Sequence, residues 1–243
     1  MKSSEKRSRA EEVAAFLRRK IFDGELQAGE RLIEADIAKE LEMSRGPVRD
    51  ALLVLEYEGL VTAKPNKGCT VTRLSGEDAY EIFYLRGMLE TEALKKCGGK
   101  LPDSSIFLMK NIIDEMKEAG NLDQSFERLL DCDERFHSEI LKSSKMERLY
   151  RLWKTMSPLN GAMFLKVRQS YEFQDEAVRR KFEKPYSRRE TWEYHLEMLE
   201  ILEKGNLEES IKIVNHHYCA TGERICRWEK RKEQMNRGIK YLE

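Results

Sequence analysis

Residues 44–59 have the sequence SRGPVRDALLVLEYEG, which contains signals for both the start and the end of a short helix. Ser44 is a favoured N-cap residue, and Pro47 lies in the first turn, where a missing backbone N–H costs little. Gly59 is suited to ending the helix. Apolar residues recur at helical spacing and predict one buried face, made of Val48, Ala51, Leu52 and Leu55.

The opposite face of this helix carries two arginines. Arg45 and Arg49 lie four residues apart near its beginning and therefore project in the same direction. The N-terminal end of a recognition helix enters the major groove of DNA, where guanidinium groups bind guanine or clamp phosphate. An ordinary surface helix can also carry two arginines, so the helix alone leaves both interpretations open.

The flanking segments favour DNA binding. Residues 33–41 predict a short helix that only two residues separate from Ser44, which is the spacing of a helix-turn-helix. Residues 60–64 and 69–74 predict two strands, joined by a turn at 65–68. Lys67 at the tip of that turn is placed to contact phosphate or the minor groove. We therefore expect a winged helix-turn-helix over residues 1–75.

This domain resembles the GntR family of bacterial transcription regulators. The matching residues are GERL at 29–32, SRGPVRDAL at 44–52, LEYEGLV at 55–61 and the wing glycine Gly68. The resemblance implies binding to double-stranded DNA, for which we predict contacts from Ser44, Arg45, Gly46, Arg49, Lys67 and Gly68.

Four positions depart from the family pattern. Ala28 stands where the family usually has proline, and Glu42 where it often has glycine in the turn; both changes concern structure. Gly46 replaces a common threonine, and Ala35 replaces an arginine that many members use on DNA. These last two substitutions concern which operator sequence is bound rather than DNA binding itself.

The composition is that of a helix-rich soluble protein. Of the 243 residues, 36% are charged, 40% are hydrophobic and only 5 are proline. Basic and acidic residues balance at 44 each, and residues 1–75 hold 14 against 13, so DNA affinity must come from the placement of charge. No apolar run approaches the roughly 20 residues of a membrane span, and no signal peptide is recognisable. The five cysteines form no CxxC pair. We expect a cytoplasmic protein without membrane contact.

Beyond Gly76 the strand signals disappear. Helices are predicted at about 77–96, 104–119, 123–143, 146–169, 188–204 and 207–232, with glycine, asparagine or serine at the breaks. Residues 171–187 remain ambiguous. Short turns between helices are typical of antiparallel bundles. The expected fold class is therefore mainly α: an N-terminal winged helix-turn-helix followed by an all-helical antiparallel bundle over residues 76–243.

Histidines indicate the chemistry of this second domain. Asp133 and His137 lie four residues apart on one predicted helix, so both side chains can reach one ion. His195 and His217 lie ten and eleven residues from the predicted turn at 205–206. If the two helices form a hairpin, these two histidines therefore stand level across it. One carboxylate and three imidazoles suit Zn²⁺, with Ni²⁺ and Mn²⁺ as alternatives, and leave coordination positions open.

Other interpretations of these residues stay open at this point. An Asp/His pair at this spacing is often only a surface hydrogen bond. His216 would point about 100° away from His217 and is the less suitable ligand. A metal-dependent hydrolase would also need a positioned acid or base, which no further motif supplies. It would also leave the winged helix unexplained, so we expect no enzyme.

The helical half resembles the FCD ligand-binding domain of the FadR-like branch of GntR regulators. The matching residues are LR–x–x–LE at 85–90, D–x–x–FH at 133–137, and His195 and His217 on either side of Gly-Asn at 205–206. The resemblance implies a helical cup in which Asp133, His137, His195 and His217 hold a divalent metal. The open positions of that metal would be taken by a small organic acid.

Two further expectations follow. The resemblance makes Arg86 the partner of the effector carboxylate; a structural salt bridge from Arg86 to Glu90, four residues on, is the alternative. One recognition helix contacts too few base pairs to be specific in a genome, so we expect a homodimer on a palindromic site. A metal-responsive regulator without an organic effector would use the same four ligands.

Overall fold

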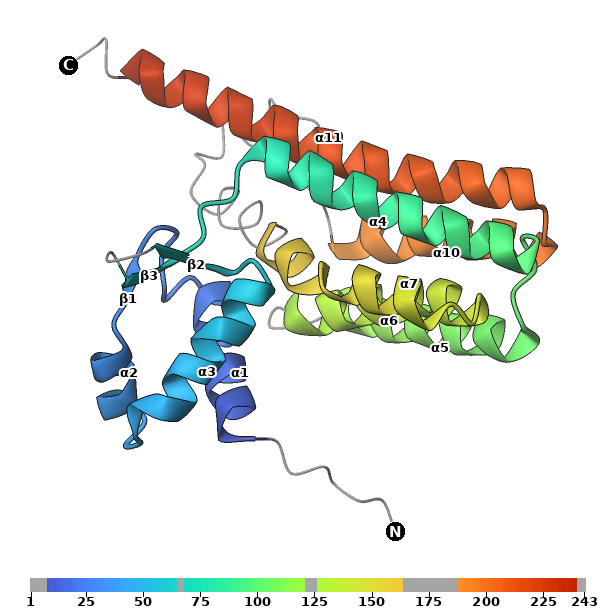
Figure 1. Ribbon diagram of the computed structural model, residues 1–243. Helices are drawn as coiled ribbons and strands as arrows, with labels where there is room; N and C mark the ends of the chain where they lie inside the picture. The colour runs from blue at the N-terminus through green and yellow to red at the C-terminus, as the bar shows by residue number, and fades with distance from the viewer. Residues whose placement is uncertain (1–7, 65–67, 121–125, 164–187, 240–243) are drawn as a thin grey trace. The chain divides into compact units, whose positions relative to one another are not determined.

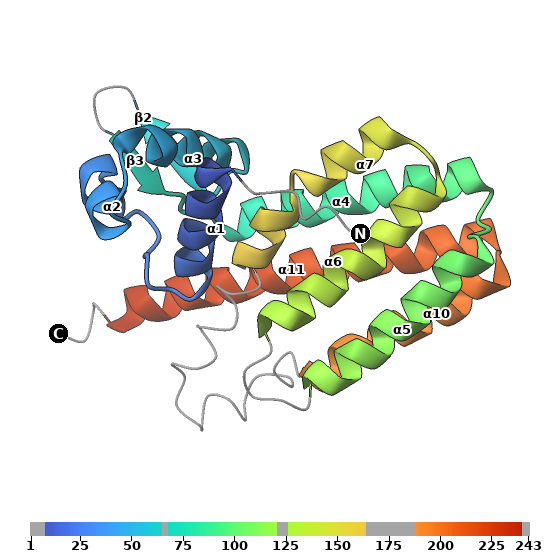
Figure 2. The ribbon, with the colours of Figure 1, turned by 90° about the horizontal axis from the view of Figure 1, so that it is seen from below.

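The computed structural model describes residues 8–64, 68–120, 126–163 and 188–239. These residues divide into two compact units (Figures 1 and 2). The first unit ends at Leu74 but also includes the segment that begins at Pro158, and the second unit begins at Ser75. The boundary thus lies one residue before the one expected, and the sequence patterns did not indicate the contribution from Pro158 onward.

The first unit is a winged helix-turn-helix, as predicted. Its elements, in chain order, are α1 (Arg9–Phe22), β1 (Arg31–Leu32), α2 (Glu34–Glu40), α3 (Arg45–Tyr57), β2 (Val61–Lys64) and β3 (Gly68–Val71). The sheet is antiparallel with the order β1-β3-β2. The two-residue strand β1 is an addition to the prediction, since a strand this short carries no detectable periodicity.

The buried stripe predicted for α3 forms the centre of this unit. Val48, Ala51, Leu52 and Leu55 are all buried, together with Val13, Ala14 and Leu17 of α1. A bidentate salt bridge fixes the C-terminal end of α3, because Arg18 donates to both carboxylate oxygens of Glu58 at 2.6 and 3.0 Å. Gly59 follows with φ +76°, a conformation that glycine adopts without strain. Leu159 and Ala162 pack against the same core.

The turn between α2 and α3 contains a strained residue. Glu42, where the family often has glycine, adopts φ +51°. This left-handed conformation costs a residue with a side chain about 1–2 kcal/mol. Glycine would remove that cost, but its greater freedom in the unfolded chain would offset about 0.4–1 kcal/mol of the stability gained.

We therefore expect Glu42→Gly to stabilise the first unit by about 0.5–1 kcal/mol. Chemical denaturation of the full chain, followed through a probe in the winged helix, measures this change. Lys39→Gly is the matched control, because Lys39 is exposed in the last turn of α2 and glycine there should destabilise. Equal losses of stability in both variants would contradict the assignment of strain to Glu42.

The second unit is all-helical, as predicted. Its described helices are α4 (Gly76–Cys97), α5 (Asp103–Gly120), α6 (Phe126–Ser143), α7 (Glu147–Lys154), α10 (Arg188–Lys204) and α11 (Leu207–Ile239). Ser75 caps α4 through a reciprocal capping box with Asp78. No helix in the described part of the chain combines the length and apolar character needed to cross a bilayer.

Two of the helix predictions need correction. The single helix expected over 146–169 is interrupted, because α7 ends at Lys154 and a turn follows at 155–156 before the helix resumes. Pro158 beyond this turn has no N–H to donate to the Lys154 carbonyl, which explains the break. Leu159, the next residue, packs in the core of the first unit. The last helix continues to Ile239, beyond its expected end at residue 232. Residues 171–187 lie outside the described residues.

The helices α4 and α11 pack closely against each other along the bundle (Figure 1). Gly87 of α4 and Gly222 of α11 both lie at this contact. A Cβ atom on Gly87 would come within 3.2 Å of Tyr218, and one on Gly222 within 3.2 Å of Phe83. These glycines therefore allow the two helices to approach closely, which brings Tyr218 and its neighbour His217 against α4.

Candidate metal centre

Three helices bring the four predicted ligands together. Asp133 and His137 come from α6, His195 from α10 and His217 from α11, and one ligand atom of each lies within 4.8 Å of the others. The Nε2 atoms of His195 and His137 lie 3.2 and 3.8 Å from Oδ1 of Asp133. Adjacent ligands of one ion are about 3.0–3.5 Å apart, so the side chains need to close only slightly around it.

The cluster is enclosed. His137 and His195 are fully buried, Asp133 is 7% exposed and His217 is partly buried. The ring of Phe136 packs edge-on against both buried imidazoles, with centroid distances of 5.5 Å to His137 and 4.8 Å to His195. A buried ionisable group is costly unless it is paired or coordinates a metal. His216, beside His217, is exposed and lies outside the cluster.

Hydrogen bonds that Nδ1 donates orient both buried imidazoles. His195 donates from Nδ1 to the carbonyl oxygen of Thr191 at 2.6 Å, and His137 donates from Nδ1 to Oε2 of Glu90 at 2.9 Å. In this tautomer Nε2 carries the lone pair, and neither Nε2 atom accepts or donates a hydrogen bond among the described residues. Buried imidazole lone pairs directed at a carboxylate are suited to a metal cation.

The ionisation of the cluster also suits a cation. Burial opposes the charged form of Asp133, but the close polar contact with His195 and the nearby imidazolium charges outweigh it and lower the Asp133 pKa well below its usual range. Burial likewise opposes protonation of His137, yet Glu90 and then Asp133 raise the His137 pKa. Asp133 is therefore ionised at neutral pH, and protons would compete with a metal for His137.

Arg86 is buried beside this cluster with little to pair with. Its guanidinium lies 3.9 Å over the ring of Trp153, and Nη1 donates to Ser157 at 3.4 Å. Its Nε and Nη2 atoms have no hydrogen-bond partner among the described residues. The salt bridge to Glu90 suggested by the i,i+4 spacing is absent from the described ion pairs, which leaves Arg86 available to an anion.

Glu90 instead accepts three hydrogen bonds, a role that the sequence did not reveal. Its Oε1 accepts from Nε1 of Trp153 at 3.0 Å and from the hydroxyl of Tyr218, while Oε2 accepts from His137. Trp153 lies 63 residues from Glu90 and Tyr218 lies 128 residues from it, so no local spacing connects them.

The predicted DNA-contacting residues of α3 lie on an open surface. Ser44, Arg45, Gly46 and Arg49 are exposed, as is Gly68 at the start of β3. Ser44 occupies the N-cap position of α3, as predicted, but its hydroxyl makes no capping hydrogen bond. A Cβ atom on Gly46 would meet nothing within 4 Å, so the fold does not require glycine there. Lys67 lies outside the described residues.

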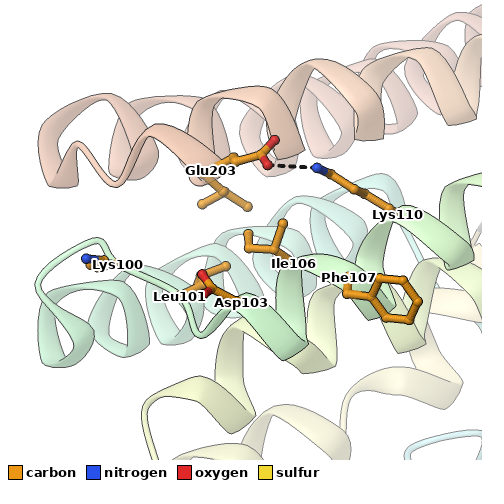
Figure 3. Close-up of a pocket in the computed structure, with 8 residues that line it drawn as sticks. Lys100, Leu101, Asp103, Ile106, Phe107, Lys110 and Glu203 are labelled. Atoms are coloured by element: carbon orange, nitrogen blue, oxygen red, sulfur yellow. Dashed lines mark hydrogen bonds and ion pairs between the residues drawn. The ribbon is translucent and has the colours of Figure 1, made fainter.

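Two surface concavities lie away from the cluster. One of about 180 Å³ separates α3 from the wing strands and is lined by residues that include Arg49, Glu34 and Gly68. The other, of about 260 Å³, lies between the start of α5 and the end of α10, where Lys110 bridges to Glu203 at 2.7 Å (Figure 3). None of the four clustered residues lines either concavity, so neither belongs to the candidate metal centre.

Known proteins match both units. Residues 9–71 match the bacterial regulatory proteins of the gntR family, and residues 81–220 match the FCD domain. The Nta operon transcriptional regulator of Aminobacter aminovorans is 31% identical over 129 residues, which are 53% of this chain and 60% of that protein. The gluconate operon transcriptional repressor of Bacillus licheniformis is 27% identical over 66% of this chain and 67% of that protein.

Solved structures share the fold. McbR/YncC of Escherichia coli superposes with a TM-score of 0.70 at 21% identity, covering 93% of this chain and 100% of that one. Lar of Listeria monocytogenes superposes with a TM-score of 0.60 at 20% identity, covering 92% and 99%. Because a gntR-type winged helix and an FCD domain together account for residues 9–71 and 81–220, the chain belongs to the GntR family of bacterial transcription regulators, in its FCD-containing branch.

Proposed function

We propose that this protein is a ligand-responsive transcription regulator that binds a palindromic operator as a homodimer and responds to a small carboxylate at a metal in its helical domain. Asp133, His137, His195 and His217 would hold the metal, with Zn²⁺ first and Ni²⁺ or Mn²⁺ as alternatives. The observation that carries the proposal is the buried pair of Nε2 lone pairs directed at Asp133. When bound, the metal supplies a Lewis acid for an anionic oxygen.

Arg86 supports a carboxylate as the effector. Two nitrogen atoms of the buried Arg86 guanidinium lack a partner among the described residues, which is costly, and a carboxylate satisfies such a group with charge-assisted hydrogen bonds. The Tyr218 ring lies near both Arg86 and the proposed metal ligands, because its centroid is 5.8 Å from the Arg86 guanidinium and 5.1 Å from the His137 ring. A short organic acid could therefore contact Arg86 with one end and the metal with the other.

The proposal is tested by selecting DNA sequences that the full chain retains from a random library and then measuring their affinity. Affinity is compared with chelator, with Zn²⁺ alone, and with Zn²⁺ plus members of a panel of dicarboxylates and tricarboxylates. We expect a change only when metal and acid are both present. A change with Zn²⁺ alone would instead favour the metal-responsive regulator, which uses the same ligands. Retention of no DNA sequence, or no change in either case, would contradict the proposal.

An exposed apolar stripe on α4 supports the proposed homodimer. Tyr80, Tyr84, Leu85 and Met88 are 40–47% exposed, and the Tyr80 and Tyr84 rings stack at 6.1 Å. Light scattering should therefore show a dimer at micromolar concentration, and Met88→Glu should shift it toward monomer by placing a charge in the contact. Phe107→Glu is the control, since Phe107 is 64% exposed on α5 and away from the stripe. A wild-type monomer, or equal effects of both variants, would contradict this interface.

Metal binding should weaken as the pH falls. The His137 pKa is raised by Glu90 and Asp133 against the effect of burial, so protons compete with the metal already above about pH 6.5. The folding stability of the metal-free chain has the opposite pH dependence. The charged imidazole of His137 stabilises the fold below about pH 6.5, and this stabilisation is lost as the pH rises through the raised pKa. The melting temperature gained on adding Zn²⁺ should therefore grow between about pH 6 and pH 9. A gain that does not change with pH would contradict His137 as a ligand.

A further inference from the structure

Glu90 connects four helices of the bundle, because it accepts hydrogen bonds from three other helices. It lies on α4 and is fully buried, and its three donors are Trp153 of α7, His137 of α6 and Tyr218 of α11. Two of the donors share Oε1, and the third, Nδ1 of His137, has Oε2 to itself at 2.9 Å. The resemblance to the family gives Glu90 no task, and Glu90 is neither one of the four proposed metal ligands nor the proposed contact of the effector.

We propose that Glu90 is a positioning residue that selects the tautomer of His137. By accepting the Nδ1 proton, it leaves the lone pair on Nε2, the atom that faces Oδ1 of Asp133 at 3.8 Å. The neutral imidazole has a single proton to place, so the partner of one nitrogen decides the state of the other. The inference rests on the proposed metal site, because only a metal requires that lone pair.

The number of donors explains why this residue is a glutamate. An ionised carboxylate only accepts hydrogen bonds, whereas a glutamine amide accepts at one end and donates at the other. If the amide nitrogen faced His137, Nδ1 would have to accept and the proton would move to Nε2, where it blocks a metal. If the amide were turned around, its nitrogen would face the N–H of Trp153, and two donors would oppose each other.

The same carboxylate also fixes the wall of the proposed effector site. Trp153, which Glu90 holds through its indole N–H, carries the Arg86 guanidinium at 3.9 Å over its ring. Both Trp153 and Glu90 are fully buried, so neither side chain has water as an alternative partner. Glu90 therefore connects the orientation of a metal ligand to the orientation of the group that faces the carboxylate.

The tautomer of His137 can be observed without any metal. Long-range ¹H–¹⁵N NMR spectra of the metal-free full chain, at a pH where the imidazoles are neutral, distinguish protonation at Nδ1 from protonation at Nε2. The chain has only four histidines, so His137 can be assigned by its loss in His137→Gln. We expect the Nδ1-protonated tautomer in the wild type. An Nε2-protonated His137 in the wild type would overturn the proposal without the need for any variant.

Substitution of Glu90 then tests the cause. Glu90→Gln should move the His137 proton to Nε2 and weaken Zn²⁺ binding about 10–100-fold, measured by competition with a chromophoric chelator. Adding Trp153→Phe should restore much of the affinity, because the amide can then turn its oxygen to His137. Glu139→Gln is the control: Glu139 is also buried but pairs with Lys142 and should change neither readout.

The two readouts separate the inference from the proposed function. A tautomer change in Glu90→Gln, together with wild-type protein that binds no Zn²⁺, would support the positioning role and contradict the metal site. Unchanged tautomer and unchanged affinity in folded Glu90→Gln would overturn the positioning role. A loss of affinity that Trp153→Phe does not restore, with the tautomer unchanged, would show that Glu90 acts only in packing and would also overturn it.

Discussion

Replacing His217 by alanine should abolish the effector response while leaving the metal-free chain folded. His217 is the proposed ligand from α11, and its removal would leave only α6 and α10 to hold an ion. The bundle also has an apolar core away from the cluster, with fully buried residues such as Met109, Ile113 and Met116, so folding should not depend on the metal. Effector and DNA communicate only through different affinities for two arrangements of the protein, and loss of the effector site removes that difference.

The experiment measures operator affinity with and without Zn²⁺ plus the active carboxylate, and metal content by elemental analysis. We expect about one metal ion per wild-type chain, and a marked loss in His217→Ala. His216→Ala is a closely matched control, because His216 is the neighbouring residue on α11 but is exposed and outside the cluster. Metal-free wild-type protein purified without chelator, together with a normal response in His217→Ala, would defeat the metal-dependent mechanism.

Replacing Arg45 by alanine should weaken binding to the selected operator by about 1–3 kcal/mol and relax specificity at one base pair. Arg45 is exposed in the first turn of α3, where a guanidinium can reach the edge of a guanine. Lys67→Ala should weaken binding to all sequences similarly, because a phosphate contact carries no sequence information.

Fluorescence anisotropy with the operator and with a scrambled duplex measures both effects at one fixed salt concentration, since phosphate contacts are salt-dependent. Arg148→Ala removes the same charge from the exposed surface of α7, outside the winged helix, and should change neither affinity. If Arg45→Ala lowered the affinity for both duplexes equally, Arg45 would be a phosphate contact and the assigned role would be wrong.

The sequence by itself was sufficient for the elements whose signals are local. The buried stripe of α3 follows from helical spacing, and the capping box of α4 follows from Ser75 and the acidic residue three positions later. The four clustered ligands were also within reach of sequence reasoning. Asp133 and His137 share one helix, and His195 and His217 lie at matched distances from one turn, so two simple geometric rules place each pair.

Other features depend on contacts between residues distant in the chain. The end of α7 at Lys154 follows in part from a local signal that the prediction overlooked, because Pro158, four residues on, has no N–H to donate to the Lys154 carbonyl. Only the packing of Leu159 against the core of the first unit depends on distant residues. The strand β1 exists because β3 offers it a pairing edge. Neither the packing of Leu159 nor the strand leaves a periodic pattern, because each depends on tertiary packing or pairing rather than on local propensity.

The surroundings of the candidate metal centre show most clearly the difference between what local spacing predicts and what distant contacts decide. A spacing of four residues made a salt bridge between Arg86 and Glu90 a reasonable alternative, since both lie on one helix. In the folded chain, Trp153 and Tyr218 donate hydrogen bonds to Glu90 from other helices, and the Trp153 ring also stacks on the Arg86 guanidinium. The sequence determined the helix on which these two charges lie and the residues available as ligands. Only the tertiary structure decided their partners, because burial removes water as a competitor and leaves each polar group to whichever neighbours the packing supplies.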